Sequence, residues 1–140
     1  PRKREVIFED RTVMIETIPL KHKVPTCGFL FTERHRDTEP QKRYAYCSDT
    51  MFREQIAEQI EGVDVLFHEA TYTEQYADKC RVTMHSTAKQ AAEIAKLAQA
   101  GKLVIGHFSA REDDHEVFLH EAQEVFPNTV LAEEGRSIEV

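Results

Sequence analysis

The sequence predicts an α/β fold, in which helices are layered on a sheet, and three observations support this prediction. Short apolar runs rich in β-forming residues alternate with amphipathic helical segments after a β-rich beginning. Several of these runs end directly in a side chain that binds metals or transfers protons. The 140 residues, 41% hydrophobic and 31% charged, fit one domain with a real core, or half of a larger domain.

The first part of the chain is predicted to form strands. Arg4 to Phe8 and Thr12 to Ile18 read as a strand pair around the turn-prone Glu9-Asp10, and Gly28 to Thr32 reads as a third strand. The charged segment Glu33 to Lys42 is predicted to be a loop, or a splice across residues that are missing from the chain.

Helices and short buried strands are predicted to alternate over the remainder. Met51 to Ile60 has helical periodicity and is followed by Gly62 as its stop. Ser86 is the expected N-cap of a helix over Thr87 to Ala100, which closes with Gly101. A further amphipathic helix is expected over Val117 to Phe126, ended by Pro127-Asn128. The expected strands are Val63 to Phe67, Leu103 to Ile105, Thr129 to Leu131 and Ser137 to Val140.

Composition narrows the class of protein. The net charge of −7 argues against a general nucleic-acid-coating surface, but not against a phosphodiester substrate, because bound divalent metal inverts the local field. No apolar run approaches the roughly 20 residues needed to cross a bilayer, and no signal peptide is visible. Cys27, Cys47 and Cys80 lack CxxC spacing and are predicted to be free or buried thiols, which indicates a reducing cytoplasm.

Four hydrophobic segments end in side chains suited to an active site. Three of them end in His22, Asp49 and His107, and the fourth ends in His68-Glu69. Neutral imidazoles and a carboxylate suit Zn²⁺, and an aspartate can bridge two metals with its two oxygens. Any one of these residues alone is more simply a polar residue in a loop, but their shared placement predicts metal ligands. Three ligands complete only part of a two-metal site.

A second constellation is a candidate for proton transfer. Glu69 and His85 form a carboxylate–imidazole pair if the strand end and the helix start face each other, and such a pair acts as a general acid near neutral pH. Taken alone, His85 is an ordinary residue at a helix start. The other histidines, His35, His115 and His120, lie in charged surroundings and are predicted to be solvated.

Phosphate binding is predicted at two places. Ser109 and Arg111 follow His107, and a guanidinium can donate two parallel hydrogen bonds to phosphate oxygens. Thr87 and the first-turn amides of its helix offer an anion-binding helix N-terminus.

Five segments carry a family resemblance that extends from about residue 17 to the end of the chain. They are Pro19 to Gly28, Tyr46 to Thr50, Phe67-His-Glu-Ala-Thr71, His85-Ser-Thr87 with Gln90-Ala-Ala92, and Gly106-His-Phe-Ser-Ala-Arg111. In these segments the chain resembles the C-terminal half of the ribonuclease Z family, the tRNA 3′-end-processing endonucleases of the metallo-β-lactamase superfamily. The resemblance implies the C-terminal half of a four-layer αββα sandwich.

The resemblance also implies a role for each site residue. His22 would bind one zinc ion and His107 the other, Asp49 would bridge both, and Arg111 would hold phosphate. Water activated between the two zinc ions would attack the phosphorus of precursor tRNA. Protonated His85, oriented by Glu69, would protonate the departing ribose 3′-oxygen. The family further implies a homodimer.

The chain departs from the family pattern in several respects. The His-x-His-x-Asp-His motif that supplies the remaining ligands is absent and is expected N-terminal to Pro1. Residues 1–140 are therefore expected to be half of one domain, inactive alone, with partial or no metal occupancy. The connection Glu33 to Lys42 is short, Glu112 follows Arg111 where the family usually has Tyr, and the arm that grips tRNA is missing. The alternatives are another phosphodiesterase or hydrolase of this fold, or a non-catalytic dimerisation or RNA-docking fragment.

Overall fold

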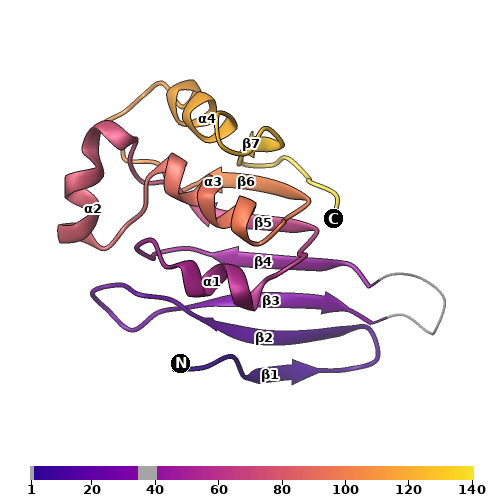
Figure 1. Cartoon of the computed structure of the whole chain (residues 1–140). Coiled ribbons are helices and arrows are strands. Elements are labelled where there is room, and N and C mark those ends of the chain that lie inside the picture. Colours follow the sequence, from indigo (N-terminus) through magenta and orange to yellow (C-terminus); the bar gives the residue numbers. More distant parts are fainter. Residues whose placement is uncertain (1, 35–40) are drawn as a thin grey trace.

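The computed structural model describes residues 2–34 and 41–140, which fold around one seven-stranded sheet (Figure 1). The strands lie in the sheet in the order in which they occur along the chain. The pairs β1–β2, β2–β3 and β3–β4 are antiparallel, whereas β4 to β7 are parallel. The strands are β1 Val6–Glu9, β2 Val13–Pro19, β3 Cys27–Glu33, β4 Arg43–Cys47, β5 Val65–Glu69, β6 Lys102–Gly106 and β7 Thr129–Leu131.

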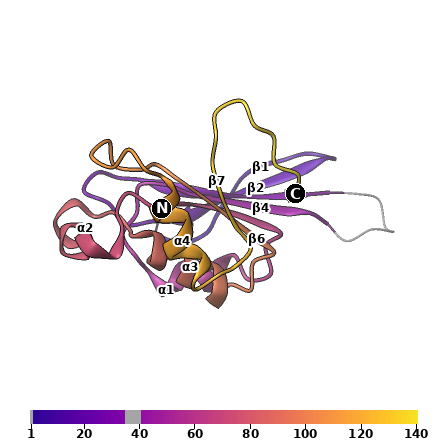
Figure 2. The same ribbon diagram turned by 90° about the horizontal axis from the view of Figure 1, so that it is seen from above.

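Helices cover one face of this sheet. In Figure 2, α1, α3 and α4 lie on the same side of the strands, and α2 lies beyond one end of them. The helical segments are α1 Glu54–Gln59, the 3-10 turn η1 Glu74–Tyr76, α2 Ala77–Thr83, α3 Ala88–Leu97 and α4 Glu116–Gln123. In the described part of the chain, no helix is long and apolar enough to cross a membrane.

The core lies between the helices and the sheet, and the register of the strands explains its composition. Leu30, Ala45, Leu66 and Leu103 stand opposite one another on four neighbouring strands, and all are buried. Side chains alternate between the two faces of a strand, so the neighbouring residues point to the other face. Helix α3 faces the core with buried alanines, and these small side chains let it lie close to the strands.

The other face of the sheet carries a patch of half-buried and exposed aromatic rings, which we call the aromatic face: Phe29, Phe31, Tyr44, Tyr46 and Phe67. Tyr46 stacks on Phe67 with ring centroids 4.8 Å apart, and Phe31 stacks on Tyr44 at 5.6 Å. The C-terminal segment contributes Ile138 and Val140 to a groove beside Tyr44 and Phe67.

Several boundaries differ from the predictions. The helix predicted over Met51 to Ile60 is limited to Glu54–Gln59, because Arg53 is extended and forms its N-cap. The predicted N-cap Ser86 is wrong: Thr87 caps α3, accepting a hydrogen bond from the Gln90 amide, while Gln90 bonds back in a capping box. The short strand predicted at Ser137 to Val140 is not formed.

The ends of two helices are also corrected. Helix α3 ends at Leu97, and the left-handed residue that follows is Gln99 with φ 53°, not Gly101. Gly101 is needed instead for close approach, because a Cβ there would lie 2.6 Å from the carbonyl oxygen of Asp64. Helix α4 ends at Gln123, three residues earlier than predicted. The turn η1 and helix α2 are additional elements that the sequence patterns do not predict.

The strand predictions and the α/β fold class are confirmed apart from shifts of one or two residues and the unformed last strand. The segment Glu33 to Lys42 is a connection between β3 and β4, and most of it lies outside the described residues. At its base the Glu33 amide donates a hydrogen bond to the Lys42 carbonyl at 2.8 Å.

Candidate active site

The site lies at one edge of the sheet, where four strands end. Because two antiparallel pairings separate β2 from β4, β2 runs in the same direction as β4, β5 and β6. Their C-terminal ends therefore meet at one edge, which is the position where open α/β sheets bind ligands. Helix α2 lies beyond this same edge (Figure 1).

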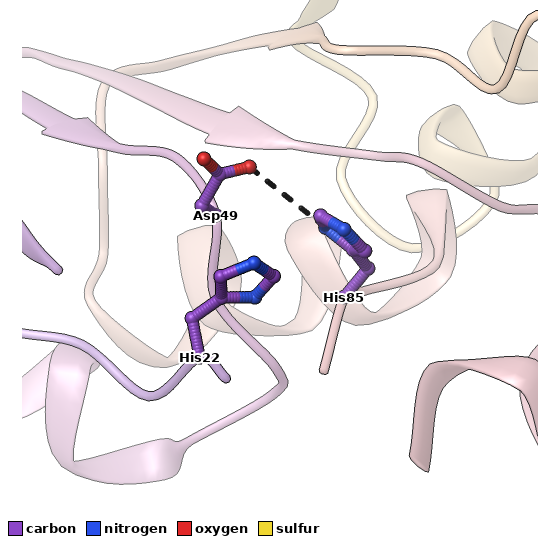
Figure 3. Close-up of side chains that lie close together, drawn as sticks. All are labelled: His22, Asp49 and His85. Carbon is purple, nitrogen blue, oxygen red and sulfur yellow. Dashed lines mark ion pairs between the residues drawn. The ribbon is translucent and has the colours of Figure 1, made fainter. Parts of the chain in front are cut away.

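Each predicted site side chain comes from a different segment at this edge. They are His22 in the β2–β3 loop, Asp49 after β4, Glu69 at the end of β5, His85 between α2 and α3, and His107 directly after β6. Figure 3 shows His22, Asp49 and His85 gathered around one space. The structure thus brings together the residues predicted to bind metal and the pair predicted to transfer protons.

Sharp backbone turns deliver three of these segments. Asp49, Met84 and His107 adopt left-handed backbone conformations, with φ of 59°, 60° and 61°. Such conformations cost energy for residues with a Cβ and concentrate at functional sites. Two of the three are predicted ligands, and the third precedes His85.

Glu69 is fully buried and fully hydrogen-bonded. Its Oε1 accepts from the Thr50 amide at 2.6 Å and from His85 Nδ1 at 2.8 Å. Its Oε2 accepts from the Thr71 hydroxyl at 2.6 Å and from the Ser86 amide at 3.1 Å. Burial raises the pKa of the Glu69 carboxyl, but these hydrogen bonds outweigh burial and hold that pKa below its usual value. Glu69 is therefore a carboxylate at neutral pH.

His85 is held as a proton donor by Glu69. The hydrogen bond to Glu69 raises the pKa of His85 above its ordinary value, against the opposing effect of burial. Its ring stacks against His107 with centroids 5.3 Å apart, and its Nδ1 lies 4.0 Å from Asp49 Oδ1. Because Nδ1 faces Glu69, Nε2 is the nitrogen that is free to exchange a proton with a substrate.

Thr71 connects the Glu69–His85 pair to His107. Its hydroxyl has one hydrogen, which goes to the Glu69 carboxylate, so its oxygen accepts from His107 Nδ1 at 2.9 Å. The lone pair of His107 is therefore on Nε2, which lies 3.3 Å from Asp49 Oδ1. This tautomer aims a ligand nitrogen of His107 at a carboxylate oxygen of Asp49.

His22 is oriented in the same way. Its Nδ1 lies 3.0 Å from the Met84 carbonyl oxygen, which can only accept, so Nδ1 carries the hydrogen and Nε2 the lone pair. The ligand atoms of His22, Asp49 and His85 lie within 4.8 Å of one another, as do those of Glu69, His85 and His107. His85 belongs to both groups, so the two groups lie side by side.

The predicted phosphate-binding residues differ in their access to the site. Ser109 and Arg111 line a pocket next to the site, which also contains Thr71. Thr87, by contrast, is fully buried, and its hydroxyl caps α3 and donates to Glu74 Oε2 at 3.1 Å. The prediction that Thr87 contacts phosphate is therefore not supported.

The predicted anion site at the start of α3 is already occupied by the protein's own groups. The Ala88 amide donates to the Tyr72 carbonyl, the Lys89 amide to the Glu121 carboxylate, and the Thr87 amide to Gln90 Oε1. With the Gln90 amide bonded to the Thr87 hydroxyl, these four first-turn amides all have partners.

Sequence reasoning misses the residues that hold the site in place. Thr50 and Thr71 lie within the family motifs, but the motifs assign them no role. Thr71 follows Glu69 by two residues, and this spacing places side chains on the same side of an extended chain. That spacing is the available signal for Thr71. The Ser86 amide and the Met84 carbonyl are backbone groups, so their hydrogen bonds to the site cannot be predicted from the sequence.

The remaining predictions on single residues agree with the structure where it describes them. His115 and His120 are exposed, and His35 lies outside the described residues. Cys27, Cys47 and Cys80 are free thiols, and burial raises the pKa of Cys47 to about 12, so this thiol is not a thiolate ligand.

Comparison with known proteins identifies related sequences. The family model for the beta-lactamase superfamily domain matches residues 3–108. The ribonuclease Z of Phocaeicola vulgatus is 42% identical, over 100% of this chain and 59% of that protein. The ribonuclease Z of Azobacteroides pseudotrichonymphae is 44% identical, over 92% of this chain and 54% of that protein. The chain thus spans somewhat over half the length of these relatives.

Solved structures show the same fold. Human tRNase Z, short form, superimposes with a TM-score of 0.73 and 27% identity, covering 98% of this chain and 48% of the human one. The metallo-β-lactamase fold protein YhfI from Bacillus subtilis gives a TM-score of 0.77 at 23% identity, covering 97% and 52%. The first alignment to a relative spans 183 residues whereas this chain has 140, so the relatives carry internal positions that this chain lacks.

Proposed function

This chain belongs to the beta-lactamase superfamily, and we propose that it forms the C-terminal part of a zinc-dependent endoribonuclease that removes the 3′ trailer from precursor tRNA. The observation that carries the proposal is the Glu69–His85 hydrogen bond of 2.8 Å beside His22, Asp49 and His107. The similarity to ribonuclease Z sequences over the whole chain supports the choice of RNA as substrate.

The residues present fit part of a zinc site. Two ligand atoms on one tetrahedral zinc ion lie about 3.3 Å apart, and His107 Nε2 and Asp49 Oδ1 are separated by 3.3 Å. Both His22 and His107 have Nδ1 engaged by the protein, which leaves Nε2 as the ligand atom, a common arrangement at zinc sites. We propose that His22 and His107 each hold one zinc ion and that Asp49 bridges them. Bound zinc would activate water and neutralise charge on the phosphoryl group.

His85 and Glu69 are proposed to perform the proton transfer. Glu69, a buried carboxylate, favours the protonated form of His85 and fixes the direction of its ring. Protonated His85 donates from Nε2 to the departing ribose 3′-oxygen, which leaves tRNA with a free 3′-hydroxyl. The guanidinium of Arg111 and the hydroxyl of Ser109 are proposed to bind the phosphate from the side of the adjacent pocket.

We further propose that residues 1–140 are the C-terminal half of one metallo-β-lactamase-type domain. The aromatic face of the sheet supports this, because Tyr46 remains 37% exposed and stacks on Phe67 on the face that carries no helices. A second half packed there would complete a four-layer sandwich and supply the missing zinc ligands. From the resemblance to the ribonuclease Z family, we also propose that the protein forms a homodimer and acts in the cytoplasm.

Incubating the full-length protein with a precursor tRNA bearing a 3′ extension tests the function. We expect a chelator to abolish release of an intact trailer and added zinc to restore it. His85→Ala should lower kcat by about 10²–10⁴-fold, the usual contribution of a general acid, while the exposed His120→Ala serves as a control. If the zinc-loaded protein hydrolyses a small phosphodiester but leaves precursor tRNA intact, another hydrolase activity of this fold replaces the proposal.

A further inference from the structure

A pocket beside the site is lined by Ser109 and Arg111 and also by residues to which the proposed mechanism gives no role. It lies between the η1–α2 segment and the loop that follows β6, and its cavity volume of about 50 Å³ admits part of a nucleotide rather than all of it. Its lining includes Tyr72, Tyr76 and Lys79 from the segment that follows β5, and Ser109, Arg111 and Glu112 from the loop that follows β6. The first three of these residues carry no signal in the sequence.

The pocket is contiguous with the site. Thr71 lines it and at the same time contacts His107 Nδ1 and Glu69 Oε2. The ring of Tyr72 lies edge-on to His85, with centroids 6.4 Å apart. Thr71 and Tyr72 therefore lie between the pocket and the two histidines, and a group in the pocket is a neighbour of the site.

The side chains of the pocket combine a ring and two cations. Tyr76 is 37% exposed, and Lys79 Nζ lies 4.4 Å from the centroid of its ring. Within the described residues, Lys79 and Arg111 form no ion pair, although the chain as a whole is acidic. Aromatic faces stack on nucleobases, and cations beside them bind the phosphates of single-stranded RNA.

We propose that this pocket binds the nucleotide next to the scissile phosphate, with its base stacked on Tyr76 and its phosphate held by Lys79 and Arg111. The proposal rests on the proposed function, because it assumes that RNA reaches the edge of the sheet. It assigns a substrate-binding role to helix α2 and turn η1, which position Tyr76 and Lys79.

Glu112, which lines the pocket next to Arg111, favours contact with a hydrogen-bond donor of the nucleotide over contact with its phosphate. A carboxylate repels phosphate and accepts hydrogen bonds. Glu112 is therefore expected to accept a hydrogen bond from the ribose hydroxyl or an amino group of the base, while Lys79 and Arg111 hold the phosphate.

The test uses the full-length protein with its metal chelated, so that RNA binds without being cut. Binding of a short single-stranded RNA that spans the cleavage position is followed by fluorescence anisotropy. We expect Tyr76→Ala to raise the Kd by about ten-fold, within the range found when a stacking ring is removed, and Tyr76→Phe to bind as the wild type. Lys79→Gln should weaken binding and reduce the slope of log Kd against log salt by about 0.7, whereas the exposed Lys96→Gln should change neither.

An RNA with an abasic site next to the cleaved bond locates the base. On this RNA the effect of Tyr76→Ala should disappear, because the ring then has no base to stack on. An unchanged Kd for Tyr76→Ala on the intact RNA, or a penalty that persists on the abasic RNA, overturns the proposal. Cleavage of precursor tRNA with metal restored is measured separately: if it fails while the Tyr76 effect on binding remains, the proposed function is wrong and the pocket assignment stands.

Discussion

Thr71 is a small residue on which the geometry of two functional groups depends. Its single hydroxyl donates to Glu69 and accepts from His107, so one side chain orients the carboxylate of the proton-transfer pair and sets the tautomer of a predicted ligand. Because it acts through Glu69 and His107, Thr71 is a positioning residue. Without this hydroxyl, Glu69 would lose a hydrogen-bond donor and His107 would lose the acceptor that fixes its tautomer.

Thr71→Val keeps the shape of the side chain but removes both hydrogen bonds. We expect it to lower the free energy of unfolding by about 1–3 kcal/mol, because Glu69 Oε2 is buried and loses a donor. Zinc affinity of the full-length protein should fall about 10–100-fold, the usual effect of losing the partner of a ligand histidine. Thr71→Ser, which retains the hydroxyl, should restore both quantities in denaturation and metal titration; equal losses in the two variants would rule out this role.

The Glu69–His85 pair should make stability depend on pH in both directions. Glu69 has a lowered pKa, so its contribution is present above the ordinary value of 4.5 and is lost as the pH falls through the lowered pKa. His85 has a raised pKa, so its contribution is present below the ordinary value of 6.5 and is lost as the pH rises through the raised pKa. Both contributions are complete between pH 4.5 and 6.5.

Glu69→Gln removes this pH dependence. In urea denaturation of the metal-free protein, we expect the loss of stability caused by Glu69→Gln to be largest between pH 4.5 and 6.5. The loss should shrink in more acidic solution and also in more alkaline solution. A loss that is constant from acid to alkaline pH would show that the charged pair does not stabilise the fold.

At the scale of elements, the start of helix α3 shows how a local signal can be read one residue out of place. Ser86 and Thr87 are both good N-cap residues, but only Thr87 has a glutamine three residues later, which is the sequence signature of a capping box. The structure uses Thr87, because Ser86 donates its hydroxyl to the Thr50 carbonyl and its amide to Glu69. One of two adjacent hydroxyl residues thus builds the helix and the other holds the site.

Thr87→Ala tests this division. We expect a loss of about 1 kcal/mol in unfolding free energy, since the Gln90 amide loses its cap. Thr87→Ser should recover most of it, and RNA cleavage by the full-length protein should keep its KM, because the Thr87 hydroxyl is buried away from substrate. A raised KM in Thr87→Ala at unchanged stability would instead favour the phosphate-binding role that the sequence suggests.

The elements that the sequence does not reveal are those whose stability comes from tertiary contacts. Helix α2 is seven residues long, lacks a side-chain cap and ends at the left-handed Met84. No local pattern identifies such a short helix, since helices of this length depend on packing for their stability. The buried strands are predictable because apolar runs bounded by turns have one simple explanation in an α/β protein.

At the scale of the whole molecule, the site residues can be predicted but their arrangement cannot. His22, Asp49, Glu69, His85 and His107 are recognisable from the sequence, and four of them follow apolar runs that place them at the edge of a sheet. Whether His22 reaches the same edge as the other residues depends on the direction of β2. The antiparallel pairings β2–β3 and β3–β4 set that direction. The supporting amides and carbonyls depend on backbone turns at Asp49, Met84 and His107.

The metal content of the isolated chain tests the proposed half-domain. The proposed ligand set of His22, Asp49 and His107 supplies fewer ligands than two tetrahedral zinc ions require. We expect residues 1–140 alone to bind zinc weakly and to show no turnover, and the full-length protein to bind two zinc ions tightly, as measured by calorimetry and metal analysis. Nuclease activity from the isolated chain would contradict this.

The strand order of the sheet, which repeats the order of the chain, has a consequence for how the protein is made. A ribosome releases the polypeptide from its N-terminal end, so each new strand finds its neighbour already outside the exit tunnel. Sheet growth can then proceed by addition at one open border, without waiting for a distant segment to be synthesised. His22, Asp49, Glu69, His85 and His107 emerge in this same succession. These five side chains are thus together only after β6 has joined the sheet, and a nascent chain that stops before this strand lacks His107.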